Sequence, residues 1–292
     1  MKTVFLDRDT FSPGIHFSAI EKQASSLTCY GITQPTEVVE RCRDADVIIS
    51  NKVLLNADTL KQLPQLKLVC IAATGTNNID LKAAQQLGIA VTNVAGYARH
   101  TVPQYVFAQI LAHYSQTEHH NQNTAKGLWP QSPTFVVLGN PMYQLADKTL
   151  GLVGYGALAK GVEKIALSFD MKVIISEHAG ATEIRPGRVS FDELLATSDI
   201  ISLHCPQTPD TVGLINAAAL SKMKPTAMLI NTARGALVDN QALLSALQSK
   251  QIGYAVLDVL EQEPPPAEHI LLNAKLDNLK ITAHIAWACQ EA

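Results

Sequence analysis

The stretch Thr149-Leu-Gly-Leu-Val-Gly-Tyr-Gly-Ala-Leu-Ala-Lys160 decides the fold of this chain. It begins with a short apolar run of the kind that forms a buried strand, and residues 157–169 then show helical periodicity. Between strand and helix, Gly154, Gly156 and Ala159 fit the pattern G-x-G-x-x-G/A. This arrangement places a pyrophosphate against free backbone N–H groups. The stretch therefore predicts a dinucleotide-binding βαβ unit.

An acidic residue at the end of the next expected strand, residues 171–176, supports this interpretation. Glu177 follows Gly156 by about 20 residues, the spacing of a carboxylate that binds the adenosine ribose. A glutamate there favours NAD, because it repels the extra phosphate of NADP. Arg185 and Arg188 follow in a loop and could weaken that preference. The alternative is a structural βαβ turn with a surface glutamate.

Composition narrows the classes of function. The 292 residues are enough for two domains of ordinary size. Charged residues make up 17% of the chain, below the ~25% of typical soluble domains, and hydrophobic residues make up 47%. These values suit buried parallel strands and an oligomer interface. The net charge of −3 and the lack of a basic run argue against nucleic acid or an anionic membrane as the main partner.

Cysteine usage and hydropathy predict a cytoplasmic protein. No signal peptide precedes the first strand, and no apolar run is long enough to span a bilayer. His119 and His120 form a pair without a third ligand nearby, so we expect a solvated helix end there and no metal site. The cysteines are scattered, odd in number and without metal spacing, which predicts reduced thiols: Cys29, Cys42, Cys70, Cys205 and Cys289.

Strand-like and helix-like segments alternate along the chain, which predicts an α/β protein with doubly wound parallel sheets. Strands are expected at residues 2–6, 46–50, 66–73, 89–92, 150–153, 171–176, 199–203, 227–231, 254–257 and 279–283. Helices are expected at residues 18–26, 56–63, 80–87, 102–113 (capped by Thr101), 157–169, 191–197, 216–223 and 240–250.

Residues 116–147 lack clear periodicity but contain apolar and aromatic side chains such as Trp129 and Phe135. A segment this long is uncommon as a plain connection, and such residues often form a contact surface. We therefore interpret it as a candidate dimer arm. A plain surface loop is the alternative.

Polar residues follow three expected strands of the second half: Arg234, Asp258 and His284, with Glu263 five residues beyond Asp258. The carboxyl ends of parallel strands meet at one crevice, where a bound dinucleotide would place its nicotinamide. An arginine binds a carboxylate through two parallel hydrogen bonds. A histidinium donates a proton to a ketone oxygen, and a glutamate favours the charged imidazole. The set predicts reduction of a 2-oxo acid; a structural arginine, a satisfied histidine and a loop-capping aspartate are the alternatives.

From Leu66 to Ala292 the chain resembles the D-isomer-specific 2-hydroxyacid dehydrogenase family. Within it, the loop after residue 72 and the Ile-Ala-Trp after the histidine are similar to glycerate dehydrogenases, also called hydroxypyruvate reductases. The most specific stretches are Ala73-Thr-Gly-Thr-Asn-Asn78, Asn231-Thr-Ala-Arg-Gly-Ala-Leu-Val-Asp239, Leu257-Asp-Val-Leu-Glu-Gln-Glu-Pro264 and His284-Ile-Ala-Trp287.

The resemblance implies a role for each site residue. Arg234 would hold the substrate carboxylate, helped by backbone N–H groups near Thr74 and Gly75. His284 would be the acid/base, with Glu263 as its partner. Further roles are implied for Trp287 as a wall of the substrate pocket, Asp258 at the nicotinamide carboxamide, Ala157 and Leu158 at the pyrophosphate, Glu177 at the ribose, and Thr101, Cys205 and Thr232 along the cofactor cleft.

The resemblance also implies two domains and a homodimer. Residues 1–98 would form a flavodoxin-like substrate domain and residues 99–284 a Rossmann NAD-binding domain, through which the dimer is built. Residues 285–292 would start a segment that returns to the first domain. Family members continue with a helix where this chain ends, which puts closure of the cleft in question.

The predicted function is hydride transfer between NAD(H) and a small 2-oxo or 2-hydroxy acid. Hydroxypyruvate/D-glycerate and glyoxylate/glycolate are the preferred pairs, while D-lactate and 3-phosphoglycerate remain open. An NAD(H)-sensing protein like the corepressor relatives of the family is the alternative from another class, because such proteins can keep the same Arg, Glu and His. A methyltransferase ranks last, since those three residues have no role in it.

Overall fold

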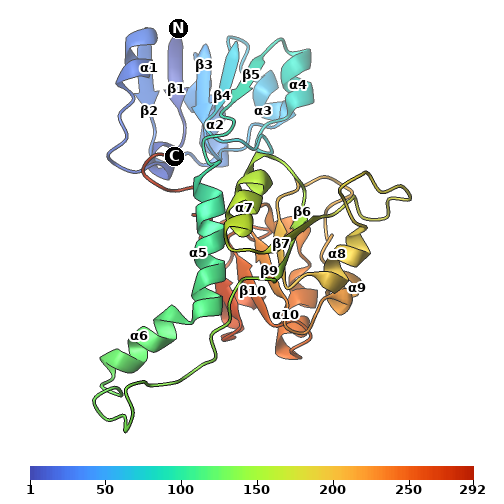
Figure 1. The fold of residues 1–292 in the computed structure, drawn as a ribbon. Helices are drawn as coiled ribbons and strands as arrows, with labels where there is room; N and C mark the ends of the chain where they lie inside the picture. Colours follow the sequence, from blue (N-terminus) through green and yellow to red (C-terminus); the bar gives the residue numbers. More distant parts are fainter. The chain divides into compact units, whose positions relative to one another are not determined.

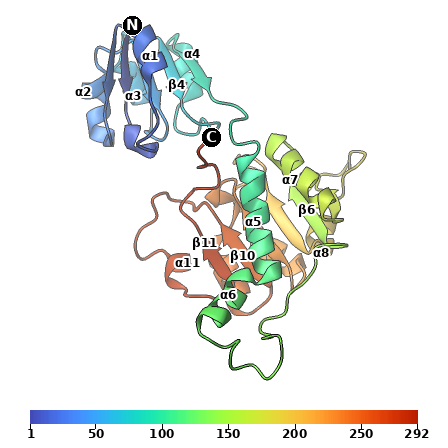
Figure 2. The same ribbon diagram turned by 60° about the vertical axis from the view of Figure 1, so that its left-hand side comes forward.

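The structure is a computed structural model that describes all 292 residues and divides them into two compact units, Met1–Tyr97 and Ala98–Ala292. Each unit is built on one parallel β-sheet with helices around it (Figures 1 and 2). This confirms the predicted fold class of two doubly wound α/β domains. No helix is long and apolar enough to cross a membrane.

The first unit has a five-stranded sheet in the order β2-β1-β3-β4-β5, which is the flavodoxin-like order. Its neighbouring strands all pair in parallel. The strands are β1 (Lys2–Phe5), β2 (Ser26–Cys29), β3 (Val47–Ser50), β4 (Leu68–Ile71) and β5 (Ala90–Asn93). The helices are α1 (Ser18–Gln23), α2 (Val38–Cys42), α3 (Ala57–Lys61) and α4 (Leu81–Gln86), with short 3-10 turns η1 (Arg8–Thr10) and η2 (Pro35–Glu37).

Two elements of this unit were not predicted. Strand β2 has Leu27 as its one large apolar residue and is mostly exposed at the sheet edge, so it lacks the apolar run of a buried strand. The predicted helix over residues 18–26 was therefore too long, because α1 ends at Gln23 and Ser26 already pairs with Lys2. Helix α2 is a single short stretch with two buried side chains, too short for its periodicity to stand out.

The second unit has a six-stranded parallel sheet in the order β11-β10-β9-β8-β6-β7. Val189 forms a single parallel bridge with Ser176, at the place where a third strand lies in the common dinucleotide-binding order. The strands are β6 (Thr149–Val153), β7 (Lys172–Ile175), β8 (Ile200–Leu203), β9 (Met228–Asn231), β10 (Tyr254–Leu257) and β11 (Leu279–Ile281). The helices are α5 (Thr101–Ser115), α6 (Thr117–Ala125), α7 (Ala157–Ser168), α8 (Phe191–Thr197), α9 (Ala217–Lys222), α10 (Asn240–Gln248) and α11 (Ile270–Asn273), with a 3-10 turn η3 (Gly235–Leu237).

The central strands β8, β9 and β10 are buried along their whole length. Side chains of α8, α9 and α10 pack with them in one apolar cluster that includes Leu194, Leu220 and Leu243. Helix α5 packs on α7, where the rings of Phe107 and Phe169 stack with centroids 5.7 Å apart. The central strands of this sheet are therefore largely apolar, and most of the predicted site residues lie in the loops at the strand ends.

Residues 116–147 show no clear periodicity in the sequence, but in the structure helix α6 occupies residues 117–125. No residue of α6 is buried, so it has no apolar stripe from which a helix can be read. The segment runs away from the sheet of its unit (Figure 1). Phe135 is 90% exposed and Leu138 is 82% exposed, and Trp129 and Met142 are also exposed.

Candidate active site

The glycine turn after β6 lies against the end of β8. Gly154 has φ +87°, and a Cβ there would lie 2.6 Å from the backbone nitrogen of Cys205. Only glycine allows both the positive φ and this close approach. A Cβ on Gly156 would meet nothing within 4 Å, so the turn faces open space next to the first turn of α7. That helix end carries backbone N–H groups without intrahelical partners. The geometry fits the pyrophosphate of a dinucleotide.

A cavity of about 360 Å³ extends from this turn between the ends of β7 and β8. Its lining includes four of the residues predicted to bind the cofactor, Gly154, Gly156, Glu177 and Cys205. Ala157, Leu158, Thr101, Thr232 and Asp258 do not line it. The first two begin α7 beside the turn, and the last two follow β9 and β10, farther along the sheet. The cavity therefore corresponds to the adenosine end of the predicted site.

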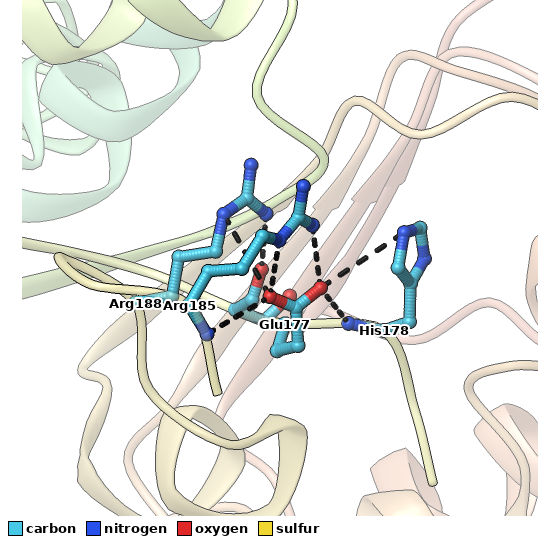
Figure 3. A network of polar contacts seen from close by, with 5 residues as sticks. Glu177, His178, Arg185 and Arg188 are labelled. Carbon is cyan, nitrogen blue, oxygen red and sulfur yellow. Dashed lines mark hydrogen bonds and ion pairs between the residues drawn. The ribbon is translucent and has the colours of Figure 1, made fainter. Parts of the chain in front are cut away.

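The carboxylate of Glu177 is buried and already bound. It accepts hydrogen bonds from Arg185 Nη2 at 2.5 Å, from Arg185 Nε at 2.6 Å and from the backbone N–H of His178 at 3.0 Å (Figure 3). The Arg185 guanidinium lowers the pKa of this carboxyl to about 2. The sequence predicted that Glu177 accepts hydrogen bonds from the adenosine ribose; in the structure the Arg185 side chain donates to both of its oxygens.

Sequence reasoning did not identify His204, which also lines the cavity. Its Nε2 lies 2.9 Å from the hydroxyl oxygen of Ser202, and burial lowers the pKa of its ring to about 4. The ring is therefore neutral at pH 7. Its place directly after a buried strand was the signal that could have marked it.

Arg234 lies in the loop after β9, and this loop touches the loop after β10. A Cβ on Gly235 would lie only 1.9 Å from the carbonyl carbon of Leu260, so the two backbones are in direct contact. Within its own loop, Arg234 Nη1 donates to the Ala233 carbonyl at 2.7 Å, and Asn231 Nδ2 donates to the Arg234 carbonyl at 2.8 Å. The contact brings the Arg234 backbone against the segment that leads to Glu263.

Thr232 precedes Arg234 and carries a buried hydroxyl oxygen without a hydrogen-bond partner. Buried polar atoms are rarely left unpaired. A polar group of a bound cofactor would supply the missing partner. This observation fits the predicted position of Thr232 beside the cofactor.

Glu263 and His284 form a pair across the loops that follow the neighbouring strands β10 and β11. Oε2 of Glu263 lies 2.6 Å from Nδ1 of His284, and Oε1 accepts the Leu260 backbone N–H at 3.1 Å. Because the carboxylate can only accept, Nδ1 carries the proton. Nε2 is then the ring atom left to exchange a proton with a substrate. Both side chains are partly exposed.

Asp258 is buried at the end of β10 and binds the segment that carries His284. Its carboxylate accepts the backbone N–H groups of Ile285 at 2.9 Å and Ala286 at 2.8 Å. It also accepts the Thr282 hydroxyl at 2.6 Å. The His284 N–H donates to the Asp258 carbonyl at 2.8 Å, and His284 itself has φ +53°. A left-handed histidine needs such support from its surroundings.

The network continues into α5. Since the Thr282 hydroxyl proton is directed at Asp258, Tyr105 must donate to Thr282, at 2.5 Å. Sequence reasoning placed Asp258 at the nicotinamide carboxamide and gave no role to Thr282 or Tyr105. The structure shows that the Asp258 carboxylate accepts the Thr282 hydroxyl on one side of His284 and the backbone N–H groups of Ile285 and Ala286 on the other.

The remaining predicted site residues lie elsewhere. Thr74 and Gly75 are in the first unit, in the loop after β4, where the Thr74 hydroxyl donates to the Val94 carbonyl at 2.8 Å. Thr101 is the first residue of α5 rather than its cap, and its hydroxyl lies 2.9 Å from Cys289 Sγ. Trp287 follows His284 and is half-buried. No cluster of three or more possible metal ligands is present.

Comparison with known proteins agrees with this geometry. Residues 107–286 match the sequence model of the D-isomer specific 2-hydroxyacid dehydrogenase NAD binding domain. The chain belongs to this family. Dehydrogenases of this family transfer a hydride between NAD and a small 2-hydroxy acid, and the present chain is an NAD-dependent member.

Relatives are similar over the whole chain. A glycerate dehydrogenase of Methylorubrum extorquens is 43% identical, covering 100% of this chain and 91% of its own length. A hydroxypyruvate reductase of Blautia hydrogenotrophica is 35% identical, covering 100% and 92%. The solved structure of an acyclic imino acid reductase in complex with NADPH and D-Arg is 30% identical, with a TM-score of 0.85 and coverage of 100% and 92%.

The contact at Gly235 yields a prediction. In Gly235→Ala the new methyl group overlaps the Leu260 backbone, so the loops of Arg234 and Glu263 must separate. We expect the free energy of unfolding to fall by about 3 kcal/mol, the upper range for overpacking, and turnover to be lost. Denaturant unfolding and NADH oxidation measure both. Gly14→Ala is the matched control, because a Cβ there meets nothing within 4 Å; equal effects of the two substitutions would contradict the contact.

The network around Asp258 yields a second prediction. Thr282→Val removes one donor to the buried carboxylate and the acceptor of Tyr105. A hydrogen bond to a charged group contributes about 1.5–3 kcal/mol, so we expect a loss of stability in this range. Turnover should fall by about tenfold or more while NADH affinity stays unchanged, because His284 loses its fixed position. Tyr105→Phe should have a smaller effect in the same direction. Unchanged turnover in Thr282→Val would show that the network does not hold His284.

Proposed function

We propose that this dehydrogenase reduces hydroxypyruvate to D-glycerate, or glyoxylate to glycolate, with NADH. The observation that carries the proposal is the 2.6 Å pair of Glu263 and His284, formed by loops after β10 and β11, with Arg234 after the adjacent β9. The names of the relatives above, glycerate dehydrogenase and hydroxypyruvate reductase, support the choice of substrate.

Each residue of this edge has a part in the proposed reaction. The bound cofactor supplies the hydride. Arg234 binds the substrate carboxylate through parallel hydrogen bonds. His284 delivers a proton from Nε2 to the ketone oxygen as the hydride reaches the carbon, so that one hydride and one proton convert the ketone to the alcohol. Glu263 holds Nδ1 and stabilises the imidazolium before transfer.

The two units have different roles in this proposal. The unit of residues 98–292 holds NAD at the glycine turn, with Ala157 and Leu158 at the pyrophosphate and Asp258 near the carboxamide. The unit of residues 1–97 acts as the substrate domain, where backbone N–H groups near Thr74 and Gly75 assist Arg234. Trp287 forms a wall of the substrate pocket. We propose a cytoplasmic location, because all five cysteines are free and a reducing compartment keeps thiols reduced.

Oxidation of NADH, followed with hydroxypyruvate, glyoxylate and pyruvate in parallel, tests the function. We expect the highest kcat/KM with hydroxypyruvate. His284→Gln should lower kcat by about 10²–10⁴-fold, the range for loss of a general acid, with NADH affinity unchanged. Arg234→Gln should mainly raise KM for the acid. Wild-type protein that binds NADH but turns over none of the acids would contradict the proposal and favour an NAD(H)-sensing protein.

We also propose a homodimer through the NAD-binding domain that uses residues 116–147 as an arm. Phe135 and Leu138 are almost fully exposed there, with Trp129, Met142 and Tyr143 nearby in sequence and also exposed. A cluster of exposed large apolar side chains marks a contact surface. A second copy of the chain is the expected occupant, because the family resemblance implies a dimer through this domain.

Sedimentation velocity tests the arm. We expect the wild-type protein to sediment as a dimer, and the double variant Phe135→Ser with Leu138→Ser to sediment as a folded monomer, because the substitutions remove the apolar contact area. Ile32→Ser, at a residue of the first unit that is 68% exposed, is the control and should leave the dimer intact. A wild-type monomer, or a dimer that survives the double substitution, would contradict the arm.

A further inference from the structure

The carboxylate of Glu177, which was predicted to bind the ribose, has few lone pairs left to accept hydrogen bonds from a ligand. A carboxylate offers about four lone-pair sites. At Glu177 two are taken by Arg185 Nη2 and Nε, a third by the His178 N–H at 3.0 Å, and the Arg185 N–H lies 3.4 Å from Oε2. The side chain of Arg185 is 56% exposed and that of Glu177 is 3% exposed. A ligand in the cavity therefore meets the guanidinium before it meets the carboxylate.

A second arginine stands beside the first. Arg188 Nε lies 4.0 Å from Glu177 Oε2, and its Nη1 donates to the Ser176 carbonyl at 2.8 Å. Figure 3 shows both guanidinium groups on the same side of the carboxylate. Both arginines line the cavity that begins at the glycine turn. The backbone bond of Val189 to β7 fixes the end of their loop at this place.

Glu177, Arg185 and Arg188 form one corner of the cavity, and the charges of this corner favour the binding of an anion. The pKa of Glu177 is about 2 because of Arg185, so the carboxylate stays charged at neutral pH and holds Arg185 in place. Two arginines then face one buried carboxylate. Asp210 also lines the cavity, but it belongs to the loop after β8, which lies across β6 from the loop after β7. The corner itself carries excess positive charge where the adenosine ribose is expected.

We propose that Arg185 and Arg188 bind the 2′-phosphate of NADPH, so that the enzyme accepts NADPH as well as NADH. A phosphate monoester carries about −1.5 to −2 charges near pH 7, and arginine guanidinium groups bind phosphate oxygens in pairs. Glu177 serves as the anchor of Arg185 rather than as the group that repels the phosphate. The inference rests on the proposed function only in that the cofactor binds at this cavity.

Binding of cofactor fragments tests the proposal without hydride transfer. Calorimetric titration compares 5′-AMP with adenosine 2′,5′-bisphosphate, which differ by the 2′-phosphate. For the wild-type protein we expect the bisphosphate to bind at least as tightly as 5′-AMP. In Arg185→Ala its affinity should fall by about tenfold or more, the effect of a lost charge-assisted hydrogen bond. The affinity for 5′-AMP should stay within about threefold and reports that the variant is folded.

Controls and opposite outcomes separate this proposal from its rivals. Arg43→Ala removes the same charge from an exposed position of the first unit and should change neither affinity. If Arg185→Ala loses 5′-AMP binding as well, Arg188→Ala is tested in its place. It should bind the bisphosphate more weakly and keep its affinity for 5′-AMP. Wild-type protein that binds the bisphosphate tenfold or more weaker than 5′-AMP would overturn the proposal. The proposal would also be overturned if the ratio of the two fragment affinities in both arginine variants equalled that of the wild-type protein. Fragment binding as expected with no turnover of any 2-oxo acid would leave this inference standing and remove only the proposed function.

Discussion

In the proposed mechanism, the chemistry of this dehydrogenase depends on the hydrogen bond between Glu263 and His284. It joins loops of two adjacent strands at 2.6 Å and fixes which nitrogen of the ring carries the proton. His284 has a left-handed conformation, and the buried Asp258 supports it by accepting the backbone N–H groups of Ile285 and Ala286. A buried carboxylate that accepts several backbone N–H groups is rigid, because each freed donor would be left unpaired.

The parallel sheet of the second unit explains why these groups meet. Its strands all end at one edge, so residues far apart in sequence, such as Gly154, Arg234 and His284, fall in loops of that same edge. Two glycines let neighbouring backbones come into direct contact. Gly154, in the loop after β6, lies against the end of β8, and Gly235, in the loop after β9, lies against the loop after β10. The cofactor end and the acid/base end of the site are thus consequences of the same strand order.

Much of this arrangement could be predicted from sequence, because buried strands and the glycine turn are local patterns. The edge strand β2 and helix α6 could not, since Ser26–Cys29 and Thr117–Ala125 contain no buried residue and show no apolar face. The pairing of Arg185 with Glu177 and the attachment of Thr282 and Tyr105 to Asp258 depend on which side chains meet after folding. The sequence marks such residues as polar but does not say which partner each one takes.

In the proposed reaction, this strand edge directs a hydride onto one face of the carbonyl carbon of a 2-oxo acid and a proton onto its oxygen. The most direct measurement is the reduction of hydroxypyruvate with NADH that carries deuterium at both C4 positions, followed by mass spectrometry and chiral analysis of the product. The account predicts D-glycerate with one deuterium bound to C2. L-glycerate, or D-glycerate without deuterium at C2, would contradict it.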